Sequence, residues 1–454
     1  MAEAVAFAEI RLWGRTVGGV AEVEDGGVVF EYEAGFRRSG LEISPLRLPL
    51  TLRGPVRFTE LQRQEGFRGL PGVLADALPD AFGKSVIRAY YTARGRSEKA
   101  FSPVHHLLYV GERALGALTF HPAEELEPRP REVEALEAET LEAEPLEAET
   151  LEAEPLEAEA LEVAALVADA RRIIAGVADV TVPETYRIGS SAGGMRPKAI
   201  VLFNPATEEV RSAFAAPCRG DIPALLKFDG VGERTIHQEL GEPEPYNRVE
   251  AAYARMARDA GLQVVRIHVL ESPDGHAHLV IPRFDRRDGA RLHQHTLGGL
   301  LHVDYNDPGA SSYEEYLRTI LHLGMPPAAV IEGYRRMVFN VLAVNQDDHV
   351  KNLSFHLSPE GTWSLTPAYD LTFARGGGWT ATHQMRIADK RAGITRGDLL
   401  TVAATFGMRN PNGIIQRVAD VLAEWPRYAR DTGVPRETVR EVEVALEERR
   451  KEVG

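Results

Sequence analysis

A five-residue repeat near the middle of the chain most constrains how it can fold. Between Leu136 and Leu161 a leucine recurs every five residues, in units of the form LEAEx. Five residues advance a helix by about 140° beyond one full turn, so the leucines form no continuous apolar stripe. Pro145 and Pro155 would also interrupt a helix. We interpret the repeat as a low-complexity linker or insert that divides the chain into two folded parts.

The same segment carries most of the net charge. The 454 residues have a formal charge of −15, and residues 134–162 contain twelve glutamates and neither lysine nor arginine. Without those glutamates the balance is about −3, so the remaining chain is nearly neutral and no general nucleic-acid-binding surface is indicated.

Composition otherwise indicates a globular cytoplasmic protein without a membrane partner. No apolar run reaches the length of a membrane span, and the N-terminus lacks the basic region and apolar stretch of a signal peptide. Cys218 is the only cysteine, so neither an intrachain disulfide nor a multi-cysteine metal site is expected.

The order of predicted elements favours an α+β fold with two lobes, a β-rich part followed by a helical part. Before the repeat, strands are predicted in residues 7–50, at 105–111 and at 114–120. Residues 70–91 are predicted to be helical, with starts near Pro71 and Pro79. After the repeat, strands are predicted at 199–203, 224–228, 264–271 and 276–284, and helices at 247–260, 312–323, 326–345, 396–407, 412–425 and 435–452. The predicted regions are an N-terminal subdomain (1–122), the acidic insert (123–162), a β-rich lobe with a nucleotide loop (163–290) and a helical catalytic lobe (291–454).

The strongest chemical signal lies in NQDDHVKN and TPAYD. Phosphoryl transfer requires a carboxylate beside the acceptor hydroxyl and oxygen ligands for Mg²⁺. Asp347 and Asn352 are five residues apart, the kinase spacing of catalytic Asp and metal-binding Asn, and Asp370 follows a predicted hairpin. Asp347 is therefore predicted as the base, with Asn352 and Asp370 as metal ligands. Asp348 is the competing base, and a polar loop with capping residues is the alternative interpretation.

Two further segments fit a nucleotide site. The small-residue run from Gly189 to Lys198 precedes a strand and could bring backbone N–H groups close to phosphates, although an ordinary glycine turn is equally compatible. Lys227 lies on a predicted strand, where a buried ammonium needs a partner, and Glu250 on the following helix could supply it. The alternative is an edge-strand lysine and a solvated glutamate. Pro282–Phe284 ends a strand that could face adenine, and His349 fits nucleotide contact or structural packing equally well.

These motifs, in this order, resemble the HipA family of serine/threonine kinases, the toxins of HipBA-type toxin–antitoxin modules. The resemblance covers nearly all of the chain outside the repeat. It rests on LWGRTVGGV, FRGLPGVLADALPDAFGK, GALTF, SSAGGMRPKA, LLKF, NRVE, IPRFDR, NQDDHVKN and LTPAYD. It implies a fold related to the protein and phosphoinositide kinases.

The resemblance also implies roles for individual residues. Asp347 matches the catalytic Asp, and Asn352 and Asp370 match the magnesium ligands. Ser191, or its neighbour Ser190, stands where the family can carry an autophosphorylated serine, whose added charge would expel the loop and inactivate the kinase. The positions that match ATP contacts are Gly193, Gly194, Met195, Arg196, Pro197, Lys198, Lys227, Pro282, Arg283, Phe284, His349, Val350, Lys351, Asn352, Tyr369 and Asp370.

Partners follow from the resemblance as well. A protein substrate is expected, an aminoacyl-tRNA synthetase by family precedent, together with a helix-turn-helix HipB-like antitoxin and operator DNA reached only through the antitoxin complex. Two other functions stay open, a pseudokinase-like binding module and a small-molecule phosphotransferase. The acidic repeat departs from the family pattern and puts the spacing of the N-terminal subdomain in doubt, but not the chemistry.

Overall fold

The computed structural model describes residues 6–92, 101–122, 160–174, 197–231, 244–287 and 289–453. The chain begins with a four-stranded antiparallel sheet in the order β3-β2-β1-β4. Trp13 and Gly14 connect β1 to β2 with positive φ angles of 49° and 75°, as a tight hairpin turn requires. The strands are β1 (Phe7–Leu12), β2 (Arg15–Glu22), β3 (Val28–Tyr32) and β4 (Leu118–Pro122).

Short helices lie between β3 and β4. They are α1 (Ala34–Arg38), η1 (Thr59–Leu61), α2 (Gly72–Ala75), α3 (Ala81–Thr92), α4 (Pro103–Val110) and η3 (Gly111–Arg113). The helical residues predicted over 70–91 form two helices, α2 and α3, which begin close to the predicted starts at Pro71 and Pro79. The predicted strand at 105–111 is wrong: this stretch lies in α4, where Ser102 and His105 form a capping box at the first turn.

A second, five-stranded antiparallel sheet follows in the order β6-β5-β7-β9-β8. Its strand β5 is buried along its whole length, which matches its continuous apolar run. The helix α7 (Tyr246–Asp259) packs against β8 and β9. The strands are β5 (Lys198–Phe203), β6 (Val210–Ser212), β7 (Ile222–Lys227), β8 (His268–Glu271) and β9 (Ala277–Pro282).

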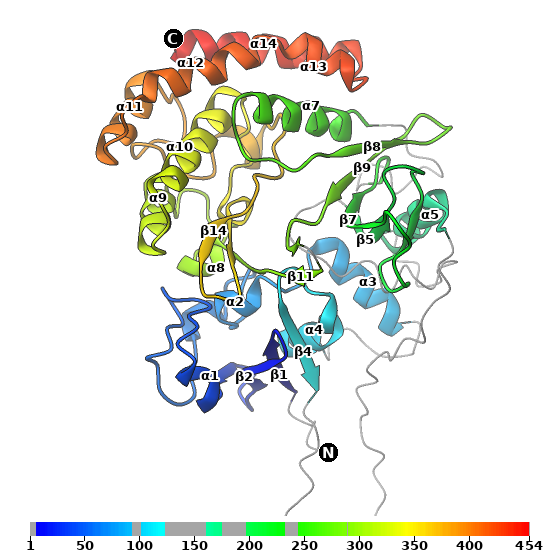
Figure 1. Cartoon of the computed structure of the whole chain (residues 1–454), viewed down its shortest axis with the longest axis vertical. Helices are drawn as coiled ribbons and strands as arrows, with labels where there is room; N and C mark the ends of the chain where they lie inside the picture. Colours follow the sequence, from blue (N-terminus) through cyan, green and yellow to red (C-terminus); the bar gives the residue numbers. More distant parts are fainter. Residues whose placement is uncertain are drawn as a thin grey trace, which may run out of the picture.

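Two helices from different parts of the sequence complete the core of this sheet. Phe82 and Val86 of α3 pack together with Leu166 of α5 (Val163–Ile174) against Val201 and Leu226 of the strands. Because α3 precedes residue 122, the N-terminal part of the chain supplies a core helix to the β-rich lobe (Figure 1).

The remainder is mostly helical. Its buried centre is α10, and the N-terminal sheet and the C-terminal helices lie at opposite ends of the molecule (Figure 1). The helices are α8 (Leu297–Leu301), α9 (Tyr313–His322), α10 (Pro327–Leu342), η5 (Val350–Asn352), η6 (Gly378–Ala381), α11 (Arg396–Thr405), α12 (Pro411–Leu422), α13 (Trp425–Asp431) and α14 (Arg436–Val453). A three-stranded sheet, β12 (His293–Thr296), β13 (Ser354–Leu357) and β14 (Trp363–Leu365), and the ribbon β10 (Arg286–Arg287) with β11 (Ala290–Arg291) complete it. Within the described ranges, no helix is long and apolar enough to cross a bilayer.

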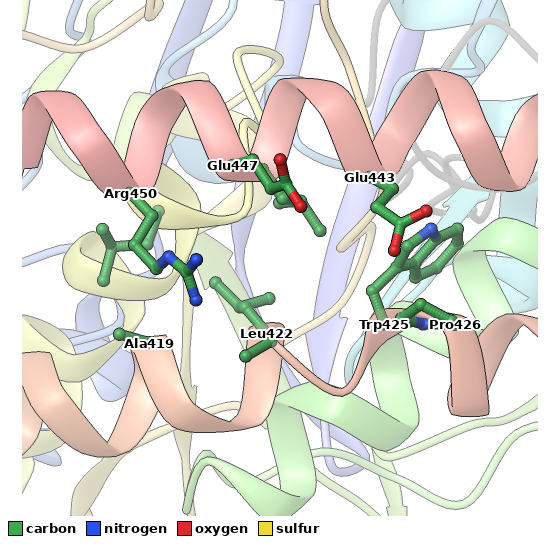
Figure 2. A pocket seen from close by; sticks show the side chains of 10 residues that line it. Ala419, Leu422, Trp425, Pro426, Glu443, Glu447 and Arg450 are labelled. Carbon is green, nitrogen blue, oxygen red and sulfur yellow. The ribbon is translucent and has the colours of Figure 1, made fainter.

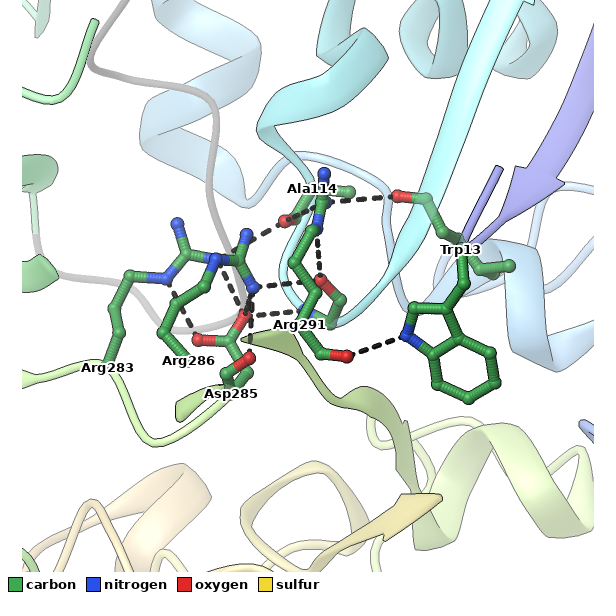
Figure 3. A network of polar contacts seen from close by, with 8 residues as sticks. Trp13, Ala114, Arg283, Asp285, Arg286 and Arg291 are labelled. Carbon is green, nitrogen blue, oxygen red and sulfur yellow. Dashed lines mark hydrogen bonds and ion pairs between the residues drawn. The ribbon is translucent and has the colours of Figure 1, made fainter. Parts of the chain in front are cut away.

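The N-terminal part is joined to the rest by close packing and by a buried ionic network. A Cβ on Gly72 of α2 would lie 2.0 Å from the Gly299 carbonyl oxygen of α8, so only glycine allows this approach. Asp285 accepts from the Arg283 and Arg286 side chains and from the Gly116 N–H, and Trp13 donates to the Arg291 carbonyl at 2.7 Å (Figure 3).

Candidate active site

A cleft lies where the N-terminal part, the five-stranded sheet and the helical part meet. The N-terminal part contributes Val73, Asp76, Ala77, Leu115 and Leu118 to its lining. The sheet contributes Lys198, Leu225, Lys227 and Ile281, and the remainder of the chain contributes Phe284, Gln294, Thr296, Lys351, Asn352, Tyr369 and Asp370. Seven residues of the predicted site therefore share one cleft: Lys198, Lys227, Phe284, Lys351, Asn352, Tyr369 and Asp370.

Lys227 is the electrostatic centre of the cleft. Its ammonium donates to Glu250 Oε1 of α7 at 2.7 Å and also contacts Asp370 Oδ1. Burial disfavours the ammonium, but the Asp370 and Glu250 carboxylates outweigh it and raise the pKa of Lys227 above its ordinary value. The predicted Lys227–Glu250 ion pair is present, and the charged lysine is held beside Asp370.

Asp370 itself has an unusual backbone. Its φ of +50° lies in the left-handed region, which is uncommon for a residue other than glycine and often occurs at functional sites. Burial opposes ionisation of its carboxyl, yet the Lys227 and Lys198 ammonium groups lower its pKa. Asp370 is therefore an ionised carboxylate placed among cations.

Lys198 begins β5 and faces an acidic residue from the N-terminal part. Its Nζ lies 3.2 Å from Asp80 Oδ2, and both side chains are buried. The other Asp80 oxygen accepts the Gly83 N–H at 2.7 Å, at the start of α3. Nearby, Asp76 accepts from His295 Nδ1 at 2.6 Å and from the Thr296 N–H at 2.7 Å.

Asp347 and Asp348 have different surroundings. Asp348 is fully enclosed: its oxygens accept from the Gln384 N–H at 2.8 Å, from His383 Nδ1 at 2.9 Å and from the Tyr313 hydroxyl at 3.0 Å. The side chain of Asp347 is 41% exposed, and its Oδ1 lies 4.0 Å from His349 Nε2. Of the two aspartates, Asp347 is the one that an incoming hydroxyl can reach.

Neighbouring groups also tune Asp347. Partial burial raises its pKa, and the carboxylates of Asp370 and Asp348 act in the same direction, whereas His349 and the Trp379 indole oppose them. A raised pKa makes a carboxylate a better proton acceptor. The Asn352 side chain donates to the Asp347 carbonyl at 2.8 Å, so its amide nitrogen is engaged by the loop.

Tyr369 and Phe284 form an aromatic wall. Their rings are stacked with centroids 5.6 Å apart, and the Tyr369 hydroxyl donates to the Lys351 carbonyl at 2.5 Å. Burial lowers the pKa of Lys351, whose Nζ lies 4.7 Å from the centre of the Tyr305 ring. This flat apolar surface lies beside cations, so it can accept the aromatic base of a nucleotide while the cations face the nucleotide's phosphates.

Five of the predicted ATP contacts among the described residues lie outside the cleft lining: Pro197, Pro282, Arg283, His349 and Val350. The predicted base Asp347 does not line the cleft either. Arg283 directs its guanidinium to Asp285 and the Ala114 carbonyl. Pro282 is paired with Ala224 at the end of β9, and Val350 is buried. Pro197 immediately precedes β5, and its carbonyl accepts the Phe228 N–H at 3.1 Å. Ser190, Ser191, Gly193, Gly194, Met195 and Arg196 fall outside the described residues.

The chemistry of Asn352 and Asp370 fits Mg²⁺, which commonly takes one or two protein oxygen ligands and completes its shell with phosphates and water. With the Asn352 nitrogen engaged by the Asp347 carbonyl, its oxygen is the atom available to a cation. Among the described residues, no group of three or more His, Cys, Asp or Glu side chains could hold a metal without such help.

Three residues near these groups are absent from the sequence-based set: Asp76, Asp80 and Trp379. The Trp379 indole donates to Asp347 Oδ1 at 2.6 Å. The only local signal for Asp76 and Asp80 is their place in LADALPDAF before a helix. That stretch does not predict contact with lysines more than a hundred residues away.

A separate pocket opens among the C-terminal helices (Figure 2). It lies between α14 and the ends of α12 and α13, with Leu422 and Trp425 at its apolar base and Glu443, Glu447 and Arg450 along α14. None of the residues predicted for phosphoryl transfer lines it, so the chemistry belongs to the first cleft.

Comparisons with known proteins give two family matches along the chain. Residues 8–121 match the HipA N-terminal domain, and residues 190–425, more than half of the chain, match the HipA-like C-terminal domain. Toxin YjjJ of Escherichia coli K12 is 27% identical over 191 residues, which is 40% of this chain and 38% of that protein. The matched region thus spans well under half of this curated relative.

A solved structure shows the same fold over the whole length. HipA of Shewanella oneidensis MR-1, determined with HipB and operator DNA, aligns with a TM-score of 0.64 at 19% identity and covers 98% of this chain and 97% of that one. The chain therefore has the two-lobed fold of that HipA, with a β-rich N-terminal portion and a helical C-terminal lobe. On the two family matches, the chain belongs to the HipA family.

Proposed function

We propose that the protein is an ATP-dependent serine/threonine protein kinase that transfers the γ-phosphate of ATP to a protein of its host cell. The observation that carries this proposal is the Lys227 ammonium held between Glu250 and Asp370 in a cleft that Asn352 also lines. Active protein kinases use such a lysine–glutamate pair beside a metal-binding aspartate.

The residues divide the work. Tyr369 and Phe284 would contact the adenine base of ATP, and Lys198 and Lys227 would hold phosphate oxygens. Asp347 would accept the proton of the acceptor hydroxyl, whose oxygen then bonds to the γ-phosphorus while ADP leaves. Asn352 and Asp370 would hold Mg²⁺, which would offset the negative charge of the phosphates.

The cellular role that we propose is that of a growth-arresting toxin. Membership of the HipA family and the likeness to the E. coli toxin support it. A HipB-like helix-turn-helix antitoxin would neutralise the kinase, and operator DNA would be reached through that complex, as the composition of the S. oneidensis assembly suggests. The protein substrate would be an aminoacyl-tRNA synthetase, following the family resemblance.

Autophosphorylation would regulate this kinase. Ser191, or Ser190 beside it, lies in the glycine-rich segment that leads into Lys198. A phosphate there would add close to two negative charges in front of the phosphate-binding lysine, and the loop would no longer accept ATP. Mass spectrometry of wild type, Ser190→Ala and Ser191→Ala identifies the modified residue. Phosphate that persists at another position in both variants would contradict this regulation.

The central test is phosphate transfer by the purified protein with Mg²⁺ and radiolabelled ATP. We expect label on the protein itself or on an aminoacyl-tRNA synthetase supplied as acceptor, and none with Asp347→Ala. Phosphoproteomics of cells that express each version then identifies the acceptor. Asp389→Asn is the matched control, because Asp389 is an exposed aspartate in a left-handed turn outside the cleft. Full transfer by Asp347→Ala, or no transfer by wild type to any acceptor, would overturn the proposal.

A further inference from the structure

The segment after Asp370 returns to the loop that carries Asp347. The Ala374 N–H donates to the Val344 carbonyl at 3.1 Å, and the Gln346 N–H donates to the Ala374 carbonyl at 2.9 Å. Three glycines follow at 376–378, and Gly378 has a φ of +67°. This turn brings the next residue, Trp379, back over the aspartate.

Trp379 contacts Asp347 through its only polar atom. The indole Nε1–H donates to Asp347 Oδ1 at 2.6 Å, and the indole meets the His349 ring edge-on with centroids 6.4 Å apart. The residue is 37% exposed, which is unusual for a large aromatic side chain. Its place is therefore explained by the aspartate rather than by burial in a core.

The backbone of Trp379 is fixed as well. The buried side-chain amide of Gln384 donates to the Trp379 carbonyl at 2.6 Å and to the Gln346 carbonyl at 3.1 Å. The Gln384 N–H in turn donates to Asp348 Oδ1 at 2.8 Å. Asp348 thus anchors Gln384, and Gln384 in turn holds the backbone of Trp379. The two adjacent aspartates are therefore connected through Gln384 and Trp379.

On the basis of the proposed function, we infer that Trp379 is a positioning residue that fixes Asp347 Oδ1 and leaves the second carboxylate oxygen to the acceptor hydroxyl. With one oxygen held, the plane of the carboxylate is set before the acceptor arrives. The acceptor proton passes to Oδ2, the hydroxyl oxygen bonds to the γ-phosphorus, and the bond from that phosphorus to the bridging oxygen breaks to release ADP. Trp379 is outside the cleft lining and serves the acceptor side.

The opposite arrangement would be a plug, in which Trp379 covers Asp347 and must leave before an acceptor enters. The two roles predict opposite changes in the rate of phosphate transfer. Removing the indole N–H slows transfer if Trp379 positions the aspartate, and speeds it if Trp379 blocks the acceptor.

The kinetic test compares Trp379→Phe with Trp379→His. Phenylalanine keeps an aromatic ring and loses the donor, and we expect kcat to fall about tenfold, with KM for ATP unchanged. Histidine restores a ring N–H and should recover most of kcat. Trp13→Phe is the matched control, because it removes an indole hydrogen bond of 2.7 Å to the Arg291 carbonyl elsewhere in the protein (Figure 3). An unchanged or raised kcat in Trp379→Phe overturns the inference.

A second measurement separates this inference from the proposed function. The chain has four tryptophans, so ¹⁵N-labelled protein gives four indole N–H signals, and Trp379→Phe identifies one of them. We expect that signal to move in Asp347→Ala while the Trp13 signal stays in place. A signal that does not move refutes the contact and the inference with it. If the signal moves in Asp347→Ala but the wild-type protein transfers no phosphate, the proposed function is overturned and the contact between Trp379 and Asp347 still stands.

Discussion

Lys198 and Asp80 form a buried ion pair between the first residue of β5 and the residue that precedes α3, with 3.2 Å between Nζ and Oδ2. The pair joins the N-terminal part of the chain to the lobe that carries the cleft. Burial raises the pKa of Asp80, and Lys198 opposes this shift.

Removing the Asp80 charge should destabilise the fold. Asp80→Asn keeps an acceptor for the Gly83 N–H but leaves the Lys198 ammonium without this carboxylate, so we expect a loss of roughly 3 kcal/mol in the free energy of unfolding. Asp80→Ala should lose about 1 kcal/mol more, because the helix also loses its N-cap. Urea unfolding measures both. In Asp80→Asn/Lys198→Met much of the loss should return, and a single variant as stable as wild type would contradict the pair.

Lys227 should be required for nucleotide affinity. In Lys227→Met the ammonium in the cleft is gone, and we expect ATP to bind at least about tenfold more weakly. Glu250→Gln keeps the lysine but loses one of its anchors, so affinity should fall less. Calorimetric titration of ATP into each protein gives the values. Equal affinity of Lys227→Met and wild type would show that Lys227 does not contact phosphate.

The two adjacent aspartates should separate activity from stability. Asp347→Asn changes a partly exposed carboxylate, so unfolding should stay within about 0.5 kcal/mol of wild type while transfer is lost. Asp348→Asn replaces a carboxylate that accepts three hydrogen bonds with an amide, whose NH₂ group cannot accept one. We expect the free energy of unfolding to fall by roughly 2 kcal/mol. Unfolding curves and transfer assays on both proteins check this. The reverse pattern would assign the base to Asp348.

Acid should weaken the network around Asp285. Burial disfavours its ionised form, but Arg283, Arg286 and the Gly116 N–H prevail and lower its pKa to about 2. Because this value lies below that of the unfolded chain, near 3.9, the stabilisation is complete above about pH 5 and is lost as the pH falls toward 2. It amounts to roughly 2–3 kcal/mol.

Asp285→Asn isolates this contribution. The variant should be less stable at neutral pH, and its free energy of unfolding should fall less steeply between pH 5 and pH 3. Urea titrations across that range give the two slopes. Identical slopes in wild type and variant would mean that another carboxyl group is responsible.

The parts of the site that could be predicted are those encoded locally or by a strong pairing rule. Asp347 and Asn352 share one loop, so their spacing is visible in the sequence. Lys227 and Glu250 were paired because a lysine on a buried strand requires a partner, and the structure contains that ion pair. The predicted helices 312–323 and 326–345 agree with α9 and α10 within three residues, and in the structure Ser312 and Pro326 are the N-cap residues of these helices.

The parts that were missed depend on tertiary contacts or on competing local signals. The apolar run at 105–111 suggested a strand, but Ser102 caps a helix there and Pro103 suits its first turn. Trp379 lies beside Asp347 because the chain turns at the three glycines and because the Gln384 side chain holds the Trp379 carbonyl. Neither contact produces a periodic pattern in the sequence.

The packing of α3 against the five-stranded sheet has a consequence for how such proteins can be divided and recombined. The two family matches, 8–121 and 190–425, suggest two exchangeable modules, yet Phe82 and Val86 belong to the core of the second. A fragment beginning after residue 122 would expose the apolar surface that α3 covers. An N-terminal half borrowed from a relative would need a helix with a matching face and an acidic residue for Lys198. The two halves are therefore expected to be inherited, and to diverge, as one unit.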